Sequence, residues 1–143
     1  MNHEEVREMI ASGDSSKLEF KSSDFRNDRL AKEVVAFSNM SGGKLLVGVE
    51  DDGVISGVED PAKMIERIVN ICRNNITPSV IPEIATARID EKTVVLLTIE
   101  KGISKPYKVK TSNRYYIRAG NVGCIADAGG TGSTVTGRFA ISF

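Results

Sequence analysis

Basic and aromatic side chains alternate along a short segment around residue 110. Six basic residues and no acidic residue lie between positions 101 and 118, whereas positions 1–100 carry 18 acidic and 12 basic residues. Lysine and arginine neutralise phosphates and tyrosine rings stack on bases, so this composition is typical of a surface that binds nucleic acid. The candidate nucleic-acid-binding residues are Lys105, Lys108, Lys110, Arg114, Tyr116 and Arg118, with Lys21 and Arg26 beside an earlier predicted strand.

These side chains fall on a predicted β-hairpin, with strands over 107–110 and 114–118 joined by a turn at 111–113. Because side chains alternate between the two faces of a strand, Lys108 and Lys110 share one side. The three candidates in the second strand likewise share one side. This pattern favours a basic binding surface over the alternative, a solvated strand with tyrosines half buried in the core.

The segment Asn39-Met-Ser-Gly-Gly43 follows a predicted helix and precedes a predicted strand. Its backbone N–H groups could cradle a phosphate. Its glycines could instead end the helix, because a helix C-cap needs a positive φ. We favour the C-cap, since neither G-x-x-x-x-G-K-[ST] nor G-x-G-x-x-G occurs in the chain.

Other kinds of reactive site find little support in the residues. His3 is the only histidine and lies in a terminus expected to fray, which leaves no base for a Ser–His or Cys–His hydrolase. Cys72 and Cys124 form no C-x-x-C pair and predict neither a zinc site nor a disulfide. We therefore expect no metal and no cofactor.

Hydrophobic periodicity predicts three helices and three β-pairs in a mixed sheet. Helices are expected over 4–12, 28–40 and after the N-cap pair Asp60-Pro61, and strands over 17–22, 45–49, 54–58, 84–89 and 93–99 in addition to the hairpin. At 143 residues and 41% hydrophobic content, the chain fits one compact α/β (α+β) domain. The glycine-rich residues 122–143 are expected to form a loosely ordered tail.

Zero net charge overall excludes a uniformly basic protein, so the segregation of charge is the informative feature. No apolar run reaches the length of a membrane span, and the first residues are acidic where a signal peptide would be basic. We expect a cytoplasmic protein with no membrane partner. A homo-oligomer is compatible with these features.

Four segments, read in order, resemble the Schlafen AlbA_2 domain family. They are Leu18-Glu-Phe-Lys21, Ala36-Phe-Ser-Asn-Met-Ser-Gly-Gly43 with Leu46-Val-Gly-Val49, Pro106-Tyr107, and Tyr115-Tyr-Ile-Arg118-Ala-Gly120. The resemblance covers about residues 5–121 and assigns the domain to 1–121. It implies a DNA-binding domain of bacterial or archaeal transcriptional regulators. The segment 122–143 departs from the family pattern.

The resemblance also implies a rival activity, because some animal relatives cleave RNA through a set of three acids. Asp14, Glu19 and an acid after Val49, Glu50 or Asp51, have a similar order here. Carboxylates of this kind hold Mg²⁺ together with substrate phosphates. We favour the structural alternative, in which Asp14 caps a turn and Asp51 belongs to a tight turn, and assign no catalytic residue.

The sequence therefore predicts a nucleic-acid-binding module of a transcriptional regulator, with DNA favoured over RNA and binding favoured over catalysis. Two rivals stay open: a metal-dependent ribonuclease that uses Asp14, Glu19 and Asp51, and a protein-interaction or nucleotide-sensing module whose sheet edge pairs with a partner.

Overall fold

The computed structural model describes residues 3–119, 122–126 and 135–136. The helices are α1 (His3–Ser12), α2 (Asn27–Asn39) and α3 (Pro61–Asn74). The strands are β1 (Leu18–Lys21), β2 (Gly43–Val47), β3 (Ile76–Thr77), β4 (Glu83–Ile89), β5 (Lys92–Ile99), β6 (Lys108–Val109), β7 (Arg114–Ala119), β8 (Val122–Ala126) and β9 (Val135–Thr136). The predicted single α+β domain is confirmed.

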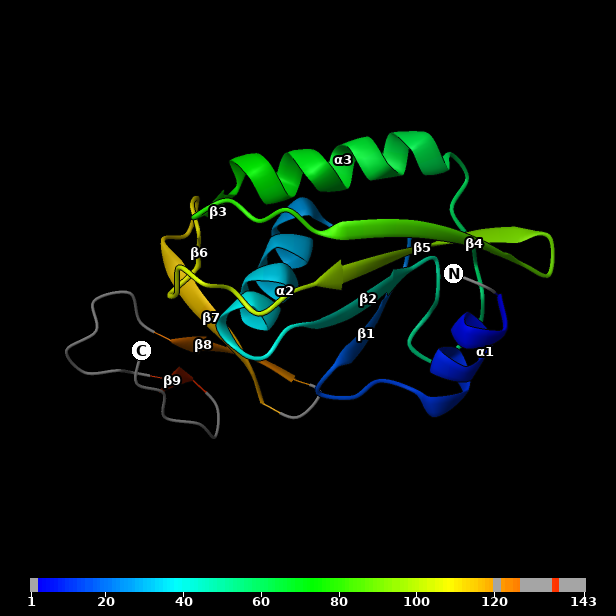
Figure 1. Ribbon diagram of the computed structural model, residues 1–143, viewed down its shortest axis with the longest axis horizontal. Helices are drawn as coiled ribbons and strands as arrows, with labels where there is room; N and C mark the ends of the chain where they lie inside the picture. The colour runs from blue at the N-terminus through cyan, green and yellow to red at the C-terminus, as the bar shows by residue number, and fades with distance from the viewer. Residues whose placement is uncertain (1–2, 120–121, 127–134, 137–143) are drawn as a thin grey trace.

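The strands form two sheets rather than one. The first has the order β1-β2-β5-β4 and is mixed, because β1 and β2 are parallel while the other pairs are antiparallel. The second has the order β3-β6-β7-β8-β9 and is antiparallel throughout. Figure 1 shows α3 along one edge of the molecule and the second sheet at the end opposite the β4–β5 turn.

The first sheet separates two apolar cores. Val6 of α1 packs with Leu18, Phe20 and Leu46 on one face. Helices α2 and α3 cover the other face, where the core continues into the second sheet through side chains such as Val109. Strand alternation places Leu18 and Phe20 toward α1, so Glu19 and Lys21 face the side of α2.

Local sequence explains where α3 begins and where α2 ends. Asp60 accepts a hydrogen bond from the Lys63 N–H at 3.1 Å ahead of Pro61, the expected N-cap arrangement. Gly42 has φ +82° and its N–H donates to the Phe37 carbonyl, so the predicted C-cap after α2 is confirmed. The Gly42 N–H is thereby used within the fold rather than offered to a phosphate.

The expected return strand at 54–58 does not form as a strand. An isolated bridge between Val49 and Ile55, together with a few loop hydrogen bonds, joins it to the preceding segment. Gly48 turns the chain away with φ +101°, and its carbonyl accepts from the N–H groups of Ser56 and Gly57. A Cβ on Gly48 would lie 3.2 Å from the Cα of Gly57, so the two glycines allow the chain segments to cross closely.

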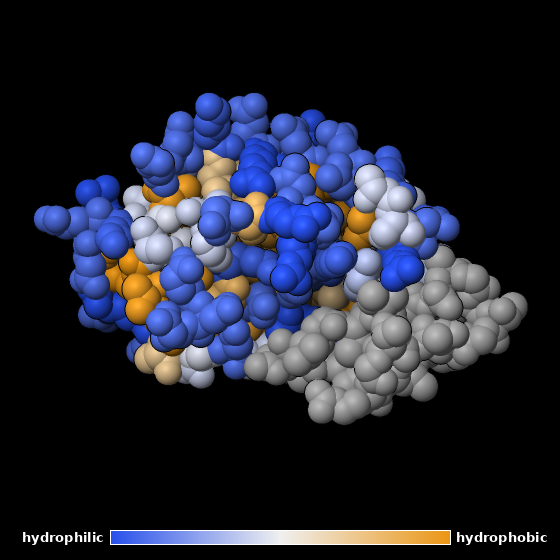
Figure 2. Space-filling model, turned by 180° about the vertical axis from the view of Figure 1, so that it is seen from behind, coloured by the Kyte–Doolittle hydropathy of each residue, from blue (hydrophilic) through white to orange (hydrophobic). Residues whose placement is uncertain are grey.

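The expected tail is partly outside the described residues. Within it, β8 pairs with β7 and β9 pairs with β8, and the part of the tail prediction that falls on 127–134 and 137–143 lies outside the described residues. In the described chain, no helix is both long and apolar enough to cross a membrane. Seen from behind, the surface is mostly hydrophilic and its apolar areas are small and separated (Figure 2).

Candidate nucleic-acid interface

The tip of the β6–β7 hairpin and the loop before it carry unpaired positive charge. Lys105, Lys110 and Arg114 are exposed, and Lys108 is half-buried. Across the described residues, ion pairs with a carboxylate are made by other basic residues and by none of these four. Unneutralised cations gathered on one hairpin and the loop before it give a local positive potential, although the chain as a whole carries no net charge.

Strand register divides the hairpin into two faces. Lys108 pairs with Thr77 of β3 on one side and with Tyr115 of β7 on the other, so these three residues form a row on one face of the second sheet. Val109 and Tyr116 point to the opposite face and belong to the main core. A cation and an aromatic ring therefore stand side by side on the face turned away from the core.

Two of the sequence candidates lie inside the fold instead of on this surface. The side chain of Arg118 is only 2% exposed, and Tyr116 is buried with its ring 5.6 Å from the Nζ of Lys32. The expectation that both belong to an exposed ribbon is wrong. They do share one side of β7, as predicted, but α2 packs against that side.

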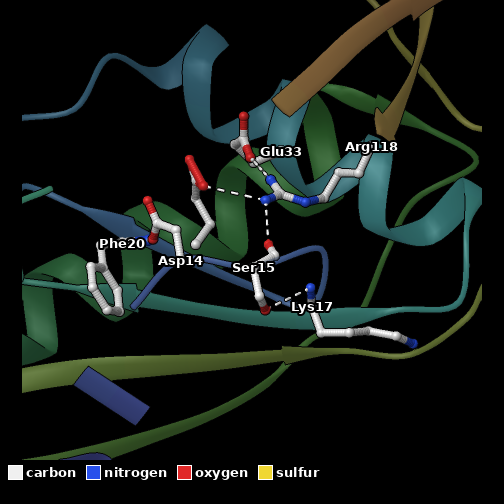
Figure 3. A network of polar contacts seen from close by, with 7 residues as sticks. Asp14, Ser15, Lys17, Phe20, Glu33 and Arg118 are labelled. Atoms are coloured by element: carbon white, nitrogen blue, oxygen red, sulfur yellow. Dashed lines mark hydrogen bonds and ion pairs between the residues drawn. The ribbon is translucent and has the colours of Figure 1, made fainter. Parts of the chain in front are cut away.

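Arg118 instead joins several elements in a buried polar cluster (Figure 3). Its guanidinium donates to Glu33 of α2 at 2.6 Å, to the Ser15 carbonyl at 2.8 Å and to Glu19 of β1 at 3.4 Å. The guanidinium carbon also lies 4.6 Å from the centre of the Phe37 ring. Among the described residues, the Nε of Arg118 finds no hydrogen-bond partner.

The cluster holds more acid than one guanidinium can neutralise. The pKa of Glu19 is raised to about 7, first by burial and then by the neighbouring carboxylate of Glu33, while the charge of Arg118 opposes the rise. Burial also raises the pKa of Asp14, although its hydrogen bond from the Phe20 N–H opposes the change. A protonated Glu19 is therefore well populated near neutral pH.

Asn39, in the glycine-rich motif after α2, fixes the hairpin against the rest of the molecule. Its Nδ2 donates to the carbonyls of Tyr107 and Tyr116, each at 2.9 Å, and its Oδ1 accepts from the Tyr107 N–H at 2.6 Å. This buried amide satisfies three backbone groups, two of Tyr107 just before β6 and one of Tyr116 in β7. The motif thus positions the basic hairpin, a role that the sequence pattern did not suggest.

Lys21 and Arg26 come together at a second location, a cavity of about 410 Å³ between β1 and the start of α2. Arg29 of α2 also lines this cavity and was missed in the sequence. Its spacing of three residues from Arg26 is the signal that could have found it, because residues i and i+3 share a helix face. The cavity is lined by acids as well, among them Glu19, Asp24, Glu33 and Asp51.

The three carboxylates of the rival nuclease site lie near one another. The turn after Gly13 folds back through a bridge between Ser15 and Leu18. The charge of Asp51 raises the pKa of Asp14, and the charge of Asp14 in turn raises the pKa of Glu19. The alternative third acid, Glu50, accepts a hydrogen bond from Ser56 at 2.6 Å. In the part of the chain that the structure describes, no group of three acidic, cysteine or histidine side chains is arranged to hold a metal ion.

Comparison with known protein families decides where the chain belongs. The family model for the Schlafen AlbA_2 domain matches residues 14–122, most of the chain. The chain belongs to the Schlafen AlbA_2 family. The matched range contains β1, α2, the Asn39 motif and the whole basic hairpin, so the site described above lies within the AlbA_2 domain.

Two solved structures share the AlbA_2 fold of this chain. One is the N-terminal domain of a protein described as related to the ATP-dependent DNA helicase RecG, from Nitrosomonas europaea, with TM-score 0.65 at 22% identity over 77% of this chain and 81% of that one. The other is the DIP2311 protein from Corynebacterium diphtheriae, with TM-score 0.62 at 23% identity over 84% of this chain. The chain spans only 25% of DIP2311. No curated protein sequence matches the chain significantly.

Proposed function

We propose that this AlbA_2 domain binds nucleic acid, with DNA favoured over RNA, as a module of a cytoplasmic transcriptional regulator. The observation that carries the proposal is the group of four cations on and before the β6–β7 hairpin, Lys105, Lys108, Lys110 and Arg114, none of which is paired with a carboxylate of the described chain. Such groups are free to neutralise phosphates.

The contact is made mainly to the sugar-phosphate backbone. Lysine and arginine on a ribbon neutralise phosphates without reading bases, and the row of Lys108 and Tyr115 adds one aromatic ring that could stack. Family membership and the fold shared with the RecG-related domain support a nucleic-acid partner. No cofactor is needed for this activity.

Charge reversal on the hairpin tests the proposal. The double variant Lys108→Glu/Arg114→Glu should bind labelled duplex DNA at least tenfold more weakly than the unchanged protein, because two phosphate contacts become repulsive. The matched control is Lys63→Glu/Arg88→Glu, which reverses two exposed cations on α3 and β4. Fluorescence anisotropy with duplex DNA, single-stranded DNA and RNA measures both. Equal effects of the two double variants would contradict the proposal.

The rival nuclease activity has its own test. We expect no cleavage of transfer RNA or single-stranded DNA in the presence of Mg²⁺ or Mn²⁺, since Glu19 already shares the guanidinium of Arg118 with Glu33. Gel analysis of labelled substrates after incubation, with Glu19→Gln beside the unchanged protein, gives the readout. Cleavage that disappears in the variant would establish the nuclease instead.

A further inference from the structure

The exposed flank of α2 carries cations at a regular spacing. Arg26, Arg29 and Lys32 follow one another every three residues, which places them along one side of the helix. From Arg26 to Lys32 the helix advances about 9 Å, roughly the length of three nucleotides along one strand of B-form DNA. Arg26 is partly neutralised by Asp28 at 3.2 Å, so Arg29 and Lys32 dominate the charge of this flank.

The flank continues into the basic hairpin. The Nζ of Lys32 lies 5.6 Å from the ring centre of Tyr116 on β7, within the range of a cation–π interaction. Arg114 is two residues before Tyr116 on the same side of that strand. Lys32 and Arg114 therefore lie beside one tyrosine on the α2 side of the hairpin, whereas Lys108 lies on its opposite face.

Buried Arg118 keeps this surface positive. Glu33 lies one helical turn after Arg29 and lines the same cavity, and it would repel a phosphate if its charge were free. Its carboxylate instead forms an ion pair with the Arg118 guanidinium at 2.6 Å, and Glu19 of β1 forms an ion pair with the same guanidinium. Neither Arg29 nor Lys32 is paired with an acid in the described part of the chain.

We propose that Arg29 and Lys32 form a second contact line, along which one sugar-phosphate strand passes from the β6–β7 hairpin across α2 toward the cavity containing Lys21. This inference rests on the proposed nucleic-acid binding and extends it from the hairpin to α2. The helix presents the cations at fixed intervals, and the Tyr116 ring holds the Lys32 ammonium in place.

The test measures how strongly binding depends on salt in the variant Arg29→Gln/Lys32→Gln. Glutamine keeps a high helix propensity and removes charge without adding repulsion. Two lost phosphate contacts should make the slope of log K against log[salt] less steep by about 1.8 for duplex DNA or about 1.4 for a single strand. The single variant Arg29→Gln, at an exposed position, should show about half that change.

The control Lys63→Gln/Arg88→Gln removes the same charge elsewhere and should leave the slope unchanged. A slope in the α2 variants equal to that of the control overturns the contact line, even if the hairpin variant Lys108→Glu/Arg114→Glu still weakens binding. Loss of the hairpin effect as well would mean that the proposed function itself fails. Unfolding curves of all variants confirm that each is folded at the titration temperature.

Discussion

The guanidinium of Arg118 ties β7 to α2, β1 and the turn at Ser15. Removing it should be costly, because two carboxylates would be left in a buried site without a counter-charge. We expect Arg118→Met to lower the free energy of unfolding by about 3–5 kcal/mol. Arg114→Met, four residues earlier on the same strand but exposed, should change it by no more than about 0.5 kcal/mol. Urea unfolding distinguishes the two, and a small effect at Arg118 would contradict this account of the cluster.

Glu19 should make stability depend on pH. Its pKa in the folded protein, about 7, lies above the ordinary value of 4.5, so the folded state binds the proton more tightly than the unfolded state does. The contribution of Glu19 to stability is therefore greatest below about pH 4.5, falls as the pH rises toward 7, and stays low above it.

The variant Glu19→Gln should lack this fall and be more stable than the unchanged protein at pH 8, by roughly 1–2 kcal/mol after allowance for solvent screening. Urea unfolding at pH 5, 6, 7 and 8 provides the comparison. Parallel profiles for the two proteins across that range would show that Glu19 does not titrate as described.

Sequence reasoning cannot separate Arg114 from Arg118. Both are arginines on the same side of one predicted strand, and both follow the pattern of an exposed basic ribbon. What separates them is tertiary: α2 packs over the end of β7 that carries Arg118 and brings Glu33 and Phe37 to it. The type and spacing of the residues were correct, whereas their exposure depended on a contact between distant elements.

Among the elements, the hairpin depends on the buried amide of Asn39. Replacing it with leucine would remove the partner of the Tyr107 N–H and of the carbonyls of Tyr107 and Tyr116. We expect Asn39→Leu to lower the free energy of unfolding by about 2–4 kcal/mol. Asn70→Leu, at an exposed position of α3, serves as the control in the same urea titration and should change it by no more than about 0.5 kcal/mol. Similar effects at the two positions would show that the three hydrogen bonds of Asn39 do not stabilise the hairpin.

Element positions were largely predictable, because each helix and most strands have a strong periodic pattern. The Asp60-Pro61 cap and the glycines after α2 appeared where their local chemistry required. The segment 54–58 has the sequence pattern of a strand, so the sequence predicts a strand where the structure has an isolated bridge between Val49 and Ile55. Its pairing is limited by the close crossing of Gly48 and Gly57, which becomes visible only in three dimensions.

At the scale of the whole molecule, zero net charge conceals a local positive surface. The acidic side chains of α1 and of the β4–β5 turn contribute to the balance of charge in the total, yet they lie toward the end of the molecule opposite the second sheet (Figure 1). Screening in physiological salt acts over about 8 Å, so distant acids do little to offset the hairpin. The division into two sheets, which the sequence did not reveal, creates this separation.

The salt dependence of DNA binding reports how many phosphates the hairpin cations contact. Labelled duplex DNA is titrated with the unchanged protein at a series of salt concentrations from about 50 to 300 mM. With the four hairpin cations on phosphates, log K should fall linearly with log[salt] with a slope of about −3.6 or steeper. A slope near zero, or no binding at the lowest salt concentration, would contradict the account.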